Sequence, residues 1–494
     1  MIGDSVERKW FILAYMILLY GIVYSYLDTI FFPFAFDDLI GIIRNPAIKS
    51  ATMASDVWNY SPERLIGFLT FGWNYQYGGL DPVGYHVVNI LTHISVTTMV
   101  LLFSREVLNA LFFDKQDPRF SSLNIDCLSL FTASIFALHP IQTQSVTYVY
   151  QRLAELAAFF YVSGLFFYVK YMRMRVAGKG GGYWFGGGVM VCGILGMFTK
   201  ENFLTYPFAC LLIDLYLDKS LPLNSKKRLS RILPVMLLLI ILPINIITHH
   251  KSIGTRVGDY SGGLVTPAAY FYTQCEVILK YLGIVFFVGP QNIDHTIAWR
   301  DSMFSGQSFI GFSVLAALLT GAFAARRRYQ VESLGVFLMF LGLAVESSVI
   351  PIKDAMFEHR MYLPAMGLFL AIGSFIFRAL PLAKAGDSWA RVCGPRIFVI
   401  TLVSAGLSFA TVSRNQVWAT TESLWSDALS KSPTSIRSLT NLSTSFMRQH
   451  DPIRGRELAL RILAIDSLDK TGEFIVTQSY IEDGDFESAA ARIR

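Results

Sequence analysis

Residues 9–27 read KWFILAYMILLYGIVYSYL, an apolar run whose single charge, Lys9, stands at its start. An α-helix of about 20 such residues crosses the hydrocarbon core of a bilayer. The run is too long for the core of a signal peptide, and no small-residue cleavage site follows it, so we expect a retained helix. Lipid is therefore the predicted solvent of this segment.

The composition extends this prediction to most of the chain. Of the 494 residues, 53% are hydrophobic and 16% are charged, whereas soluble domains carry about 25% charged residues. Apolar runs of spanning length recur along the sequence and make an ordinary soluble fold untenable. The predicted spans, about eleven in all, are 9–27, 85–104, 125–140, 153–172, 183–199, 203–217, 232–248, 308–325, 333–350, 362–379 and 396–412.

The net charge of +6 reflects membrane topology rather than a nucleic-acid site. Basic residues collect in alternate short loops, which the positive-inside rule assigns to the cytosol. The N-terminus is then cytosolic and residues 413–494 lie outside. The residues that carry this assignment are Arg8, Lys9, Arg105, Lys115, Arg119, Arg173, Arg175, Lys179, Lys226, Lys227, Arg228, Arg231, Arg326, Arg327, Arg328, Lys384, Arg391 and Arg396.

Two predicted outer loops, 28–84 and 249–307, are rich in Gly, Pro and aromatic residues and are long enough to fold over the membrane surface. Segment 264–288 is also apolar, but a span there would invert every later loop. We therefore expect it to form an outer interfacial or re-entrant helix.

The sequence after the last span changes to amphipathic soluble helix. Phe446 and Tyr480 lie 34 residues apart, each before a turn signal, and this is the tetratricopeptide period. We therefore predict an all-α protein: a membrane domain, 1–412, and an extracytoplasmic tail, 413–494, of about two such repeats. So short an array buries little surface, so the tail should lean on the membrane domain or on a partner.

Polar side chains crowd the predicted outer ends of the helices. Such groups are costly in a membrane unless they are paired or functional. Asp37 and Asp38 follow the first span in an aromatic stretch, where a neighbouring like charge and partial burial raise the pKa of a carboxyl group and suit it to act as a general base. The alternative is that the pair caps a helix at 39–43.

Four outer cations could converge on one anion, as in a phosphate clamp. The alternative is that each cation snorkels toward lipid headgroups. Glu201 is expected to neutralise Lys200, and Glu155 to pair with Arg152 at i, i+3. The four are Arg152, Lys200, His359 and Arg360.

His86, Asn89 and His93 share one helix face. Because no carboxylate stands on that helix, we favour hydrogen bonds between helices and predict no bound metal there. A divalent cation near Asp37 and Asp38 is the only cofactor that remains open. The further substrate-site candidates are Arg64, His86, His139, Gln151, Glu201 and His295.

The sequence contains no P-loop, GxSxG or HExxH motif, and no GxGxxG in a strand–helix context. Nothing therefore supports ATP-driven transport, serine hydrolysis, zinc proteolysis or redox chemistry with a nucleotide cofactor.

Seven ordered blocks carry a family resemblance: FAFDDLIGIIRNPAI (34–48), LTFGWNYQYGGLDPVGYHVVNILTH (69–93), FALHPIQTQSVTYVYQRLAEL (136–156), TKENFLTYP (199–207), TQCEVILKYLGIVFFVGPQNIDH (273–295), FEHRMYLPAMG (357–367) and RNQVWATTESLWSDALSKSP (414–433). From about residue 30 onward, the chain resembles the GT-C glycosyltransferases. More closely, it resembles the transmembrane and tetratricopeptide-repeat O-mannosyltransferases and bacterial membrane proteins of the same layout.

The resemblance implies a donor sugar on a polyprenyl phosphate or diphosphate, entering from the membrane lipid, and a protein or glycan acceptor on the outer face. The family's first-loop acid maps onto Asp37 or Asp38, which would deprotonate the acceptor for inverting in-line attack. The four clamp cations would hold the departing phosphate. The chain departs from the family pattern where Arg64 precedes Leu65 and Ile66 instead of Pro-Leu. Its short repeat array favours a bacterial cytoplasmic membrane over the endoplasmic reticulum.

Three alternatives remain open. An oligosaccharide transferase or glycan polymerase would take a whole glycan from a lipid diphosphate. A lipid or glycan transporter would need polar groups through the depth of the bilayer, where the inner helix halves offer mainly Asp214. A non-catalytic assembly scaffold would use the repeats alone.

Overall fold

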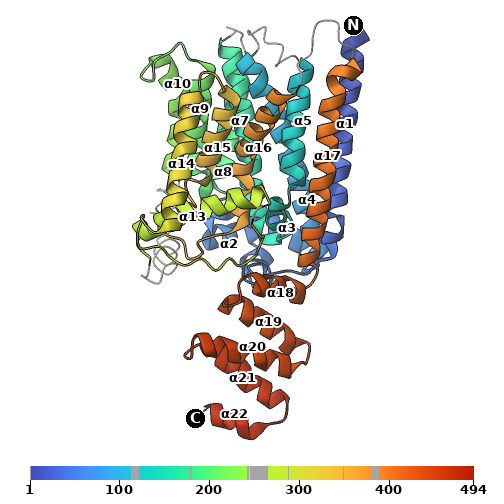
Figure 1. Ribbon diagram of the computed structural model, residues 1–494, viewed down its shortest axis with the longest axis vertical. Helices are drawn as coiled ribbons and strands as arrows, with labels where there is room; N and C mark the ends of the chain where they lie inside the picture. The colour runs from blue at the N-terminus through green and yellow to red at the C-terminus, as the bar shows by residue number, and fades with distance from the viewer. Residues whose placement is uncertain are drawn as a thin grey trace.

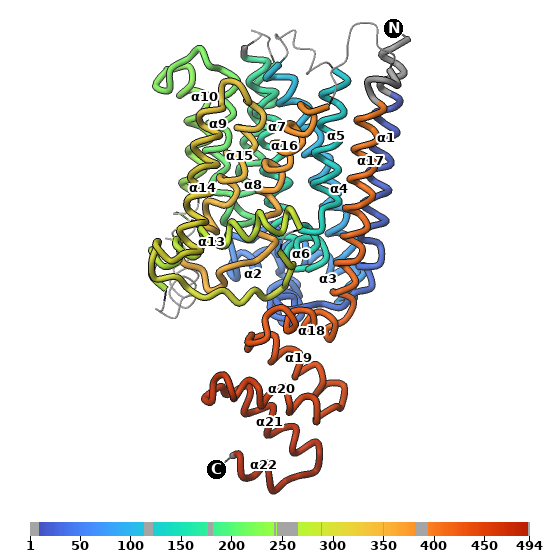
Figure 2. Tube along the Cα trace, in the orientation of Figure 1, coloured from blue at the N-terminus to red at the C-terminus, as the bar shows by residue number. Residues whose placement is uncertain are grey.

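The protein is a tall helical bundle from one end of which a smaller helical tail projects (Figure 1, Figure 2). The computed structural model describes residues 2–112, 122–176, 181–241, 244, 265–287, 289–348, 350–380 and 389–493. All regular secondary structure in these ranges is helical. This agrees with the all-α prediction, since a helix satisfies its backbone hydrogen bonds within its own segment, as lipid requires.

The bundle helices correspond to the predicted apolar runs. Peripheral side chains such as Met16, Tyr20 and Phe409 are exposed, as expected where lipid covers the surface. The four cysteines whose side chains are described, at 127, 192, 210 and 275, are free and buried. The bundle contains α1 (Ile2–Tyr26), α4 (Pro82–Phe112), α5 (Ser122–Leu138), α7 (Arg152–Val176), α8 (Gly182–Met197), α9 (Tyr206–Leu217), α10 (Lys226–Met236), α14 (Gly306–Ala325), α15 (Gln330–Leu343), α16 (Tyr362–Ala379) and α17 (Trp389–Asn415).

Six helices in the described ranges are long and apolar enough to cross a membrane, or seven if α5 and α6 (Thr143–Val146), bent by 51°, form one span. Two further apolar helices, α8 and α15, are shorter. The predicted span 203–217 corresponds to the short helix α9. The predicted span 232–248 overlaps the last residues of α10, which contains Pro234, and η9 (Leu237–Ile240), while its residues 242, 243 and 245–248 lie outside the described ranges. The count of eleven thus exceeds what length and composition establish, and it stays a prediction.

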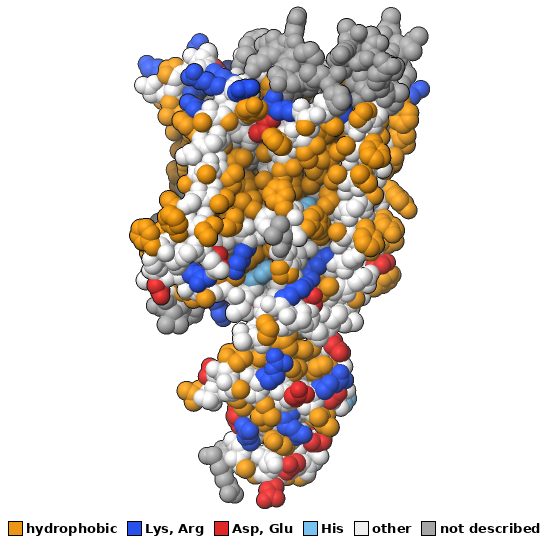
Figure 3. All heavy atoms as spheres, viewed as in Figure 1, with side chains coloured by type: hydrophobic (Ala, Val, Ile, Leu, Met, Phe, Trp, Pro, Cys, Tyr) orange, Lys and Arg blue, Asp and Glu red, His pale blue; other side chains and the backbone are white. Residues whose placement is uncertain are grey.

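The two ends of the bundle differ in charge and content. The N-terminus and α10 lie at one end, while α2, α3 and the tail lie at the other (Figure 1), with α6 close to α2 and α3 (Figure 2). On the face in Figure 3, Lys and Arg gather along the N-terminal end above a broad apolar band. Of the predicted cytosolic cations, Lys115, Arg119, Lys179 and Lys384 lie outside the described residues.

The first outer loop folds into short helices over the end of the bundle that carries the tail: η1 (Leu27–Phe31), η2 (Leu39–Ile43), η3 (Ala47–Lys49), α2 (Met53–Tyr60), η4 (Pro62–Arg64) and α3 (Leu65–Gly78). At the same end, α13 (Pro267–Val285) runs across the long axis of the bundle (Figure 1). It covers most of the segment for which the sequence predicts an interfacial or re-entrant helix. Residues 249–264 of the second outer loop lie outside the described residues.

The tail consists of α18 (Thr421–Lys431), α19 (Ile436–Arg448), α20 (Pro452–Ile465), α21 (Lys470–Glu482) and α22 (Phe486–Ile493). The start of α21 follows that of α19 by 34 residues, which is the spacing that the sequence predicts. Trp418 and Trp425 share a buried cluster with Phe32, Tyr148 and Ile293 of the membrane domain. The expectation that the tail leans on the membrane domain is therefore confirmed.

We expect the end that carries the tail to face outward. A cysteine at Leu468, which is 85% exposed, should react with a membrane-impermeant maleimide on intact cells. A cysteine at Leu223, which is 62% exposed near α10, should react only after permeabilisation. Both variants also carry Cys393→Ser, so that the native cysteine at position 393 cannot react with the reagent. The reverse pattern of labelling would invert the orientation.

Candidate functional site

The Asp38 carboxylate holds the first outer loop against the start of α7. It is buried, and it accepts the Ala35 N–H at 2.8 Å and the Tyr150 N–H at 2.7 Å. Burial raises the pKa of Asp38 to about 8, although both backbone bonds lower it. The carboxylate makes no cap bond to η2, so the helix-cap alternative is wrong for Asp38, because its side chain points back toward α7.

Gly41 allows η2 to approach Tyr150 closely, since a Cβ at this position would lie 2.2 Å from the tyrosine ring. Phe36, just before the acidic pair, has a φ of +50°. A bulky residue with this backbone conformation costs about 1–3 kcal/mol and persists only where its surroundings enforce it. Here the Phe36 ring packs on Tyr148 and Trp425.

Asp37 is only partly buried, and its N–H donates to the Tyr148 hydroxyl at 2.7 Å. Burial raises the pKa of the Asp37 carboxyl, a hydrogen bond from Tyr148 lowers it, and Asp354 raises it again. Arg437 and Arg64 lie close enough to lower it slightly. The Asp37 carboxylate is thus partly exposed and within electrostatic reach of two cations, while Asp38 is occupied by two backbone N–H donors.

Arg437, at the start of α19, links the tail to this loop. Its guanidinium pairs with Asp294 at 2.8 Å and with Asp354 at 2.6 Å, and it stands 5.1 Å from the centre of the Phe36 ring. One tail residue therefore joins three membrane-domain segments that lie far apart in the sequence.

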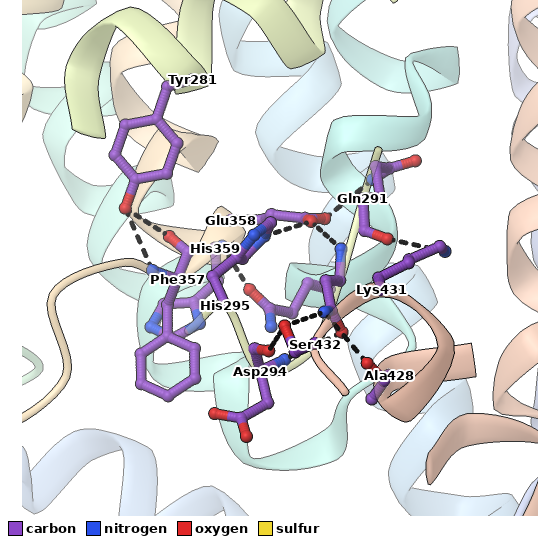
Figure 4. A network of polar contacts seen from close by, with 12 residues as sticks. Tyr281, Gln291, Asp294, His295, Phe357, Glu358, His359, Ala428, Lys431 and Ser432 are labelled. Carbon is purple, nitrogen blue, oxygen red and sulfur yellow. Dashed lines mark hydrogen bonds and ion pairs between the residues drawn. The ribbon is translucent and has the colours of Figure 1, made fainter. Parts of the chain in front are cut away.

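A second link between tail and membrane domain surrounds Glu358, in η10 (Glu358–Met361), as Figure 4 shows. The buried carboxylate accepts Gln291 Nε2 at 2.8 Å and contacts His295 Nε2 at 3.0 Å. On the tail side, Ser432 Oγ accepts from Asn292 Nδ2 at 3.0 Å. His295, predicted as a substrate-site residue, is thus engaged in joining η10 to the second outer loop.

Arg64 lies near three of the four predicted clamp residues, Lys200, His359 and Arg360. Arg64 pairs with Glu201 at 2.9 Å, and Lys200 with Glu346 at 2.9 Å. The expectation that Glu201 mainly neutralises Lys200 is therefore wrong, because Lys200 extends to the loop after α15 while Glu201 faces Arg64. Lys200, Arg360 and Arg64 all lie within electrostatic reach of the buried His359 ring, so these three cations converge around one imidazole.

Arg360 donates to the carbonyl oxygens of Asp354 at 2.8 Å and Ala355 at 3.1 Å. These two bonds hold the loop that precedes η10. Because Asp354 also pairs with Arg437, the cationic group and the tail meet on one loop.

Buried polar atoms without a hydrogen-bond partner gather beside these cations in the described part of the chain. The N–H of His359 donates to Gln144 Oε1 at 2.8 Å, so α6 and η10 are in direct contact. The ring of His359 and the side-chain amide of Gln144 each keep a nitrogen without a hydrogen-bond partner, which costs about 1–3 kcal/mol per buried group. The atoms are Gln142 Oε1 and Nε2, Gln144 Nε2, Ser145 Oγ, Asn202 Oδ1, Glu346 Oε2, Ser347 Oγ and His359 Nδ1.

Arg152 is fully buried, and its guanidinium is directed at protein acceptors. It also stacks 4.5 Å from the centre of the Phe71 ring, and it thereby holds α3 on α4 and α7. The predicted phosphate contact of Arg152 finds no support in this geometry. Its acceptors are Asn89 Oδ1 and Asn74 Oδ1, each at 2.7 Å, Tyr85 O at 2.8 Å and Thr70 Oγ1 at 3.2 Å.

The expected ion pair between Glu155 and Arg152 does not form. Both carboxylate oxygens of Glu155 are buried without a hydrogen-bond partner among the described residues. The partners of Arg152 are on α3 and α4, so its side chain turns away from the next turn of α7.

The histidine face of α4 makes the predicted hydrogen bonds between helices. His86 Nε2 contacts Phe32 O at 3.1 Å, and His93 Nδ1 contacts the Tyr362 hydroxyl at 2.6 Å. His139 Nε2 contacts Val285 O at 3.0 Å, and Gln151 is buried in η7 (Val149–Gln151). These candidate residues are therefore engaged in contacts between protein segments.

Within the described ranges, no group of three His, Cys, Asp or Glu residues could hold a metal ion. The divalent cation considered for Asp37 and Asp38 therefore gains no support from additional ligands, and Asp38 is already occupied by two backbone donors.

Several residues of the site escape sequence reasoning. Tyr148 and Tyr150 alternate before α7, and this spacing alone hints that both face the loop. Gln144, Glu346 and Arg437 carry no comparable signal. Their roles arise from contacts between segments that lie far apart in the sequence.

Fold and site together define a multispanning helical membrane protein with a charged polar site at the end that carries the tail. The chain is 24% identical to Protein O-mannosyl-transferase TMTC3 of Mus musculus over 82% of its own length and 46% of that protein. It is 22% identical to human TMTC3 over 83% of this chain and 47% of that protein. The chain is thus a relative of these O-mannosyl-transferases, as the sequence resemblance predicts.

The chain spans about half the length of the TMTC3 proteins it matches. A shorter stretch is 30% identical to human Protein O-mannosyl-transferase TMTC4, over 28% of this chain and 20% of that protein. No protein-family model matches. The crystal structure of ArnT from Cupriavidus metallidurans bound to undecaprenyl phosphate covers 98% of this chain and 79% of its own at 12% identity, with a TM-score of 0.42. That similarity is too low to carry an inference.

The link through Arg437 predicts that the tail orders the acidic loop. Charge-assisted hydrogen bonds contribute about 1.5–3 kcal/mol each, so Arg437→Leu should speed amide exchange in residues 34–38 by roughly 10-fold or more. The matched control is Arg456→Leu, whose partner Asp483 lies within the tail. Unchanged exchange in 34–38 in the Arg437 variant would mean that the tail does not order this loop.

Proposed function

We propose that this protein is a GT-C-type membrane glycosyltransferase that transfers one sugar from a polyprenyl phosphate to a protein hydroxyl on the outer face. The observation that carries the proposal is the position of Asp37, partly exposed and within electrostatic reach of Arg64, beside the group of Lys200 and His359. The related O-mannosyl-transferases support the same class of reaction.

Asp37 acts as the general base. Its carboxylate takes the proton of the acceptor hydroxyl while the oxygen attacks the anomeric carbon from the face opposite the phosphate. The bond from that carbon to the phosphate oxygen breaks, the configuration inverts, and the lipid phosphate leaves with the electron pair. Asp38 does not touch the reactants. It positions Asp37 because its carboxylate accepts the N–H of Ala35 in the loop and the N–H of Tyr150 just before α7.

The departing phosphate is held by the cations Lys200 and Arg64 and by an N–H of the His359 ring. Negative charge grows on this group in the transition state, so cations fixed beforehand stabilise the transition state more than the bound donor. The partnerless buried atoms around Gln144 supply further hydrogen bonds to oxygen. Lys200 and Arg64 are each paired with one carboxylate, which keeps them ordered before the donor arrives.

The transporter alternative has little to support it. Asp214, the main ionisable group of the inner helix halves, is buried and pairs with Arg228 at 2.6 Å and Arg231 at 3.0 Å. A buried acid that is neutralised in this way stabilises the contact between helices and does not provide a site for a transported substrate. The alternative of a lipid diphosphate donor is separated by assay: a sugar on polyprenyl monophosphate should be consumed, and the same lipid with a diphosphate-linked glycan should not.

Asp37→Asn should lower transfer by roughly 10² to 10⁴, the usual contribution of general base catalysis, without lowering Tm. Asp38→Asn should instead lower Tm, because one of the two side-chain oxygens that accept a backbone N–H becomes an NH₂ group facing that N–H donor. The measurements are glycosylated acceptor per inserted protein and thermal unfolding in detergent. Full transfer by the Asp37 variant would remove it as the base.

The pH dependence follows from the same carboxyl. The base must be ionised, so transfer should fall as pH drops through its pKa, and burial raises the pKa of Asp37 above the ordinary aspartate value. The acid limb of the kcat/KM profile should therefore lie above about pH 4, the ordinary pKa of aspartate. The residual activity of Asp37→Asn should lack this limb.

The residues proposed to hold the phosphate should lower the barrier to transfer, so that replacing them reduces kcat and does not only weaken binding of the donor. His359→Ala and Lys200→Gln should each lower kcat by roughly 10² or more, the scale of one lost oxyanion donor. The control is Lys280→Gln, which removes an α13 cation whose partner Glu276 keeps Arg300. An increase in the KM for the donor with unchanged kcat would place these residues in ground-state binding only.

A further inference from the structure

A cavity of about 140 Å³ lies between the first outer loop and the tail. Pro33, Phe34, Phe36 and Leu39 line it on the loop side, and α18 and α19 on the tail side. Phe36 immediately precedes Asp37 in the chain, so the cavity ends one residue from the proposed base. Neither the loop nor the tail alone forms this space.

The tail wall is a polar stripe along α19. Asn441, Thr444 and Arg448 line the cavity and follow one another at i, i+3 and i+7, so they share a helix face. Asn441 Nδ2 donates to Arg437 O at 2.8 Å, which leaves its carbonyl oxygen available. In the described ranges no hydrogen bond or ion pair engages the Thr444 hydroxyl or the Arg448 guanidinium. The stripe therefore offers both donors and acceptors beside an apolar wall.

This combination suits a polypeptide in extended conformation. Every residue of such a segment presents a backbone N–H and C=O that need partners, and alternate side chains point to opposite faces. A helix, about 10–12 Å across with its side chains, is too thick for the space. Trp418 and Trp425 in the lining are 4% and 2% exposed, so no open indole face awaits a sugar ring, and a glycan fits less well.

We infer that this cavity binds the acceptor polypeptide, with an apolar side chain in the cavity and a Ser or Thr hydroxyl delivered to Asp37. The inference rests on the proposed function and locates its acceptor. The uncompensated charge of Arg448 favours an acidic residue in the same segment. The tail then serves as one wall of the acceptor site, and its docking on the loop completes the enzyme.

Binding can be measured without any sugar transfer. The probe is a fluorescein-labelled, end-blocked peptide of nine residues in which Thr alternates with Val and one end carries Asp, added to the full chain in nanodiscs. Thr444→Trp should fill the cavity and weaken binding at least 10-fold. Gln478→Trp is the matched control, because it occupies the same position 34 residues later, away from the loop. Arg448→Glu should reverse the preference for the Asp peptide over its Lys counterpart.

Transfer assays then separate this site from the proposed chemistry. Thr444→Trp should increase the KM for the peptide acceptor at least 10-fold, whereas Gln478→Trp should leave that KM at its wild-type value. Wild-type affinity in Thr444→Trp, or no binding of the peptide by the wild-type chain, would overturn the acceptor site. Normal transfer by Asp37→Asn, with peptide binding still sensitive to Thr444→Trp, would overturn the base and leave the site standing.

Discussion

The site depends on the contact of one buried carboxylate with two backbone N–H groups. Asp38 bridges Ala35 and Tyr150, and a carboxylate bound in this way fixes both segments in place. Its position holds Phe36 in a strained backbone conformation and leaves Asp37 partly exposed beside Tyr148. Two adjacent aspartates thus take different roles, because one is enclosed by the backbone and the other faces the open side of the loop.

Charge balance explains how so many ionisable groups gather at one end of a membrane bundle. A buried cation without a counter-ion is strongly disfavoured, and here Arg64, Lys200 and Arg437 each have an acidic partner. Those partners come from η8 (Glu201–Thr205), from the loop after α15 and from the second outer loop. The pairs therefore hold segments that lie far apart in the sequence together at this end of the bundle.

The sequence predicts the helical class, the docked tail, its 34-residue spacing and the acidic loop correctly, since these follow from apolar runs and local motifs. Its errors concern pairing. Glu201 was expected to act on Lys200 and Glu155 on Arg152, because each pair is close in the chain. Packing instead brings Arg64 to Glu201 across 137 residues and Asn89 to Arg152 across 63 residues, and distant contacts of this kind leave no periodic signal.

Hydropathy, charge distribution and local spacing are properties of contiguous segments, so the sequence by itself determined that this chain enters a membrane and carries a helical tail. It also determined that Asp37 and Asp38 follow the first apolar helix within about ten residues. Only the tertiary structure decided which aspartate remains accessible and that Arg437 reaches the loop that carries the two aspartates. Those outcomes depend on which side chains, brought together from distant segments, fill each other's hydrogen-bonding capacity once water is excluded.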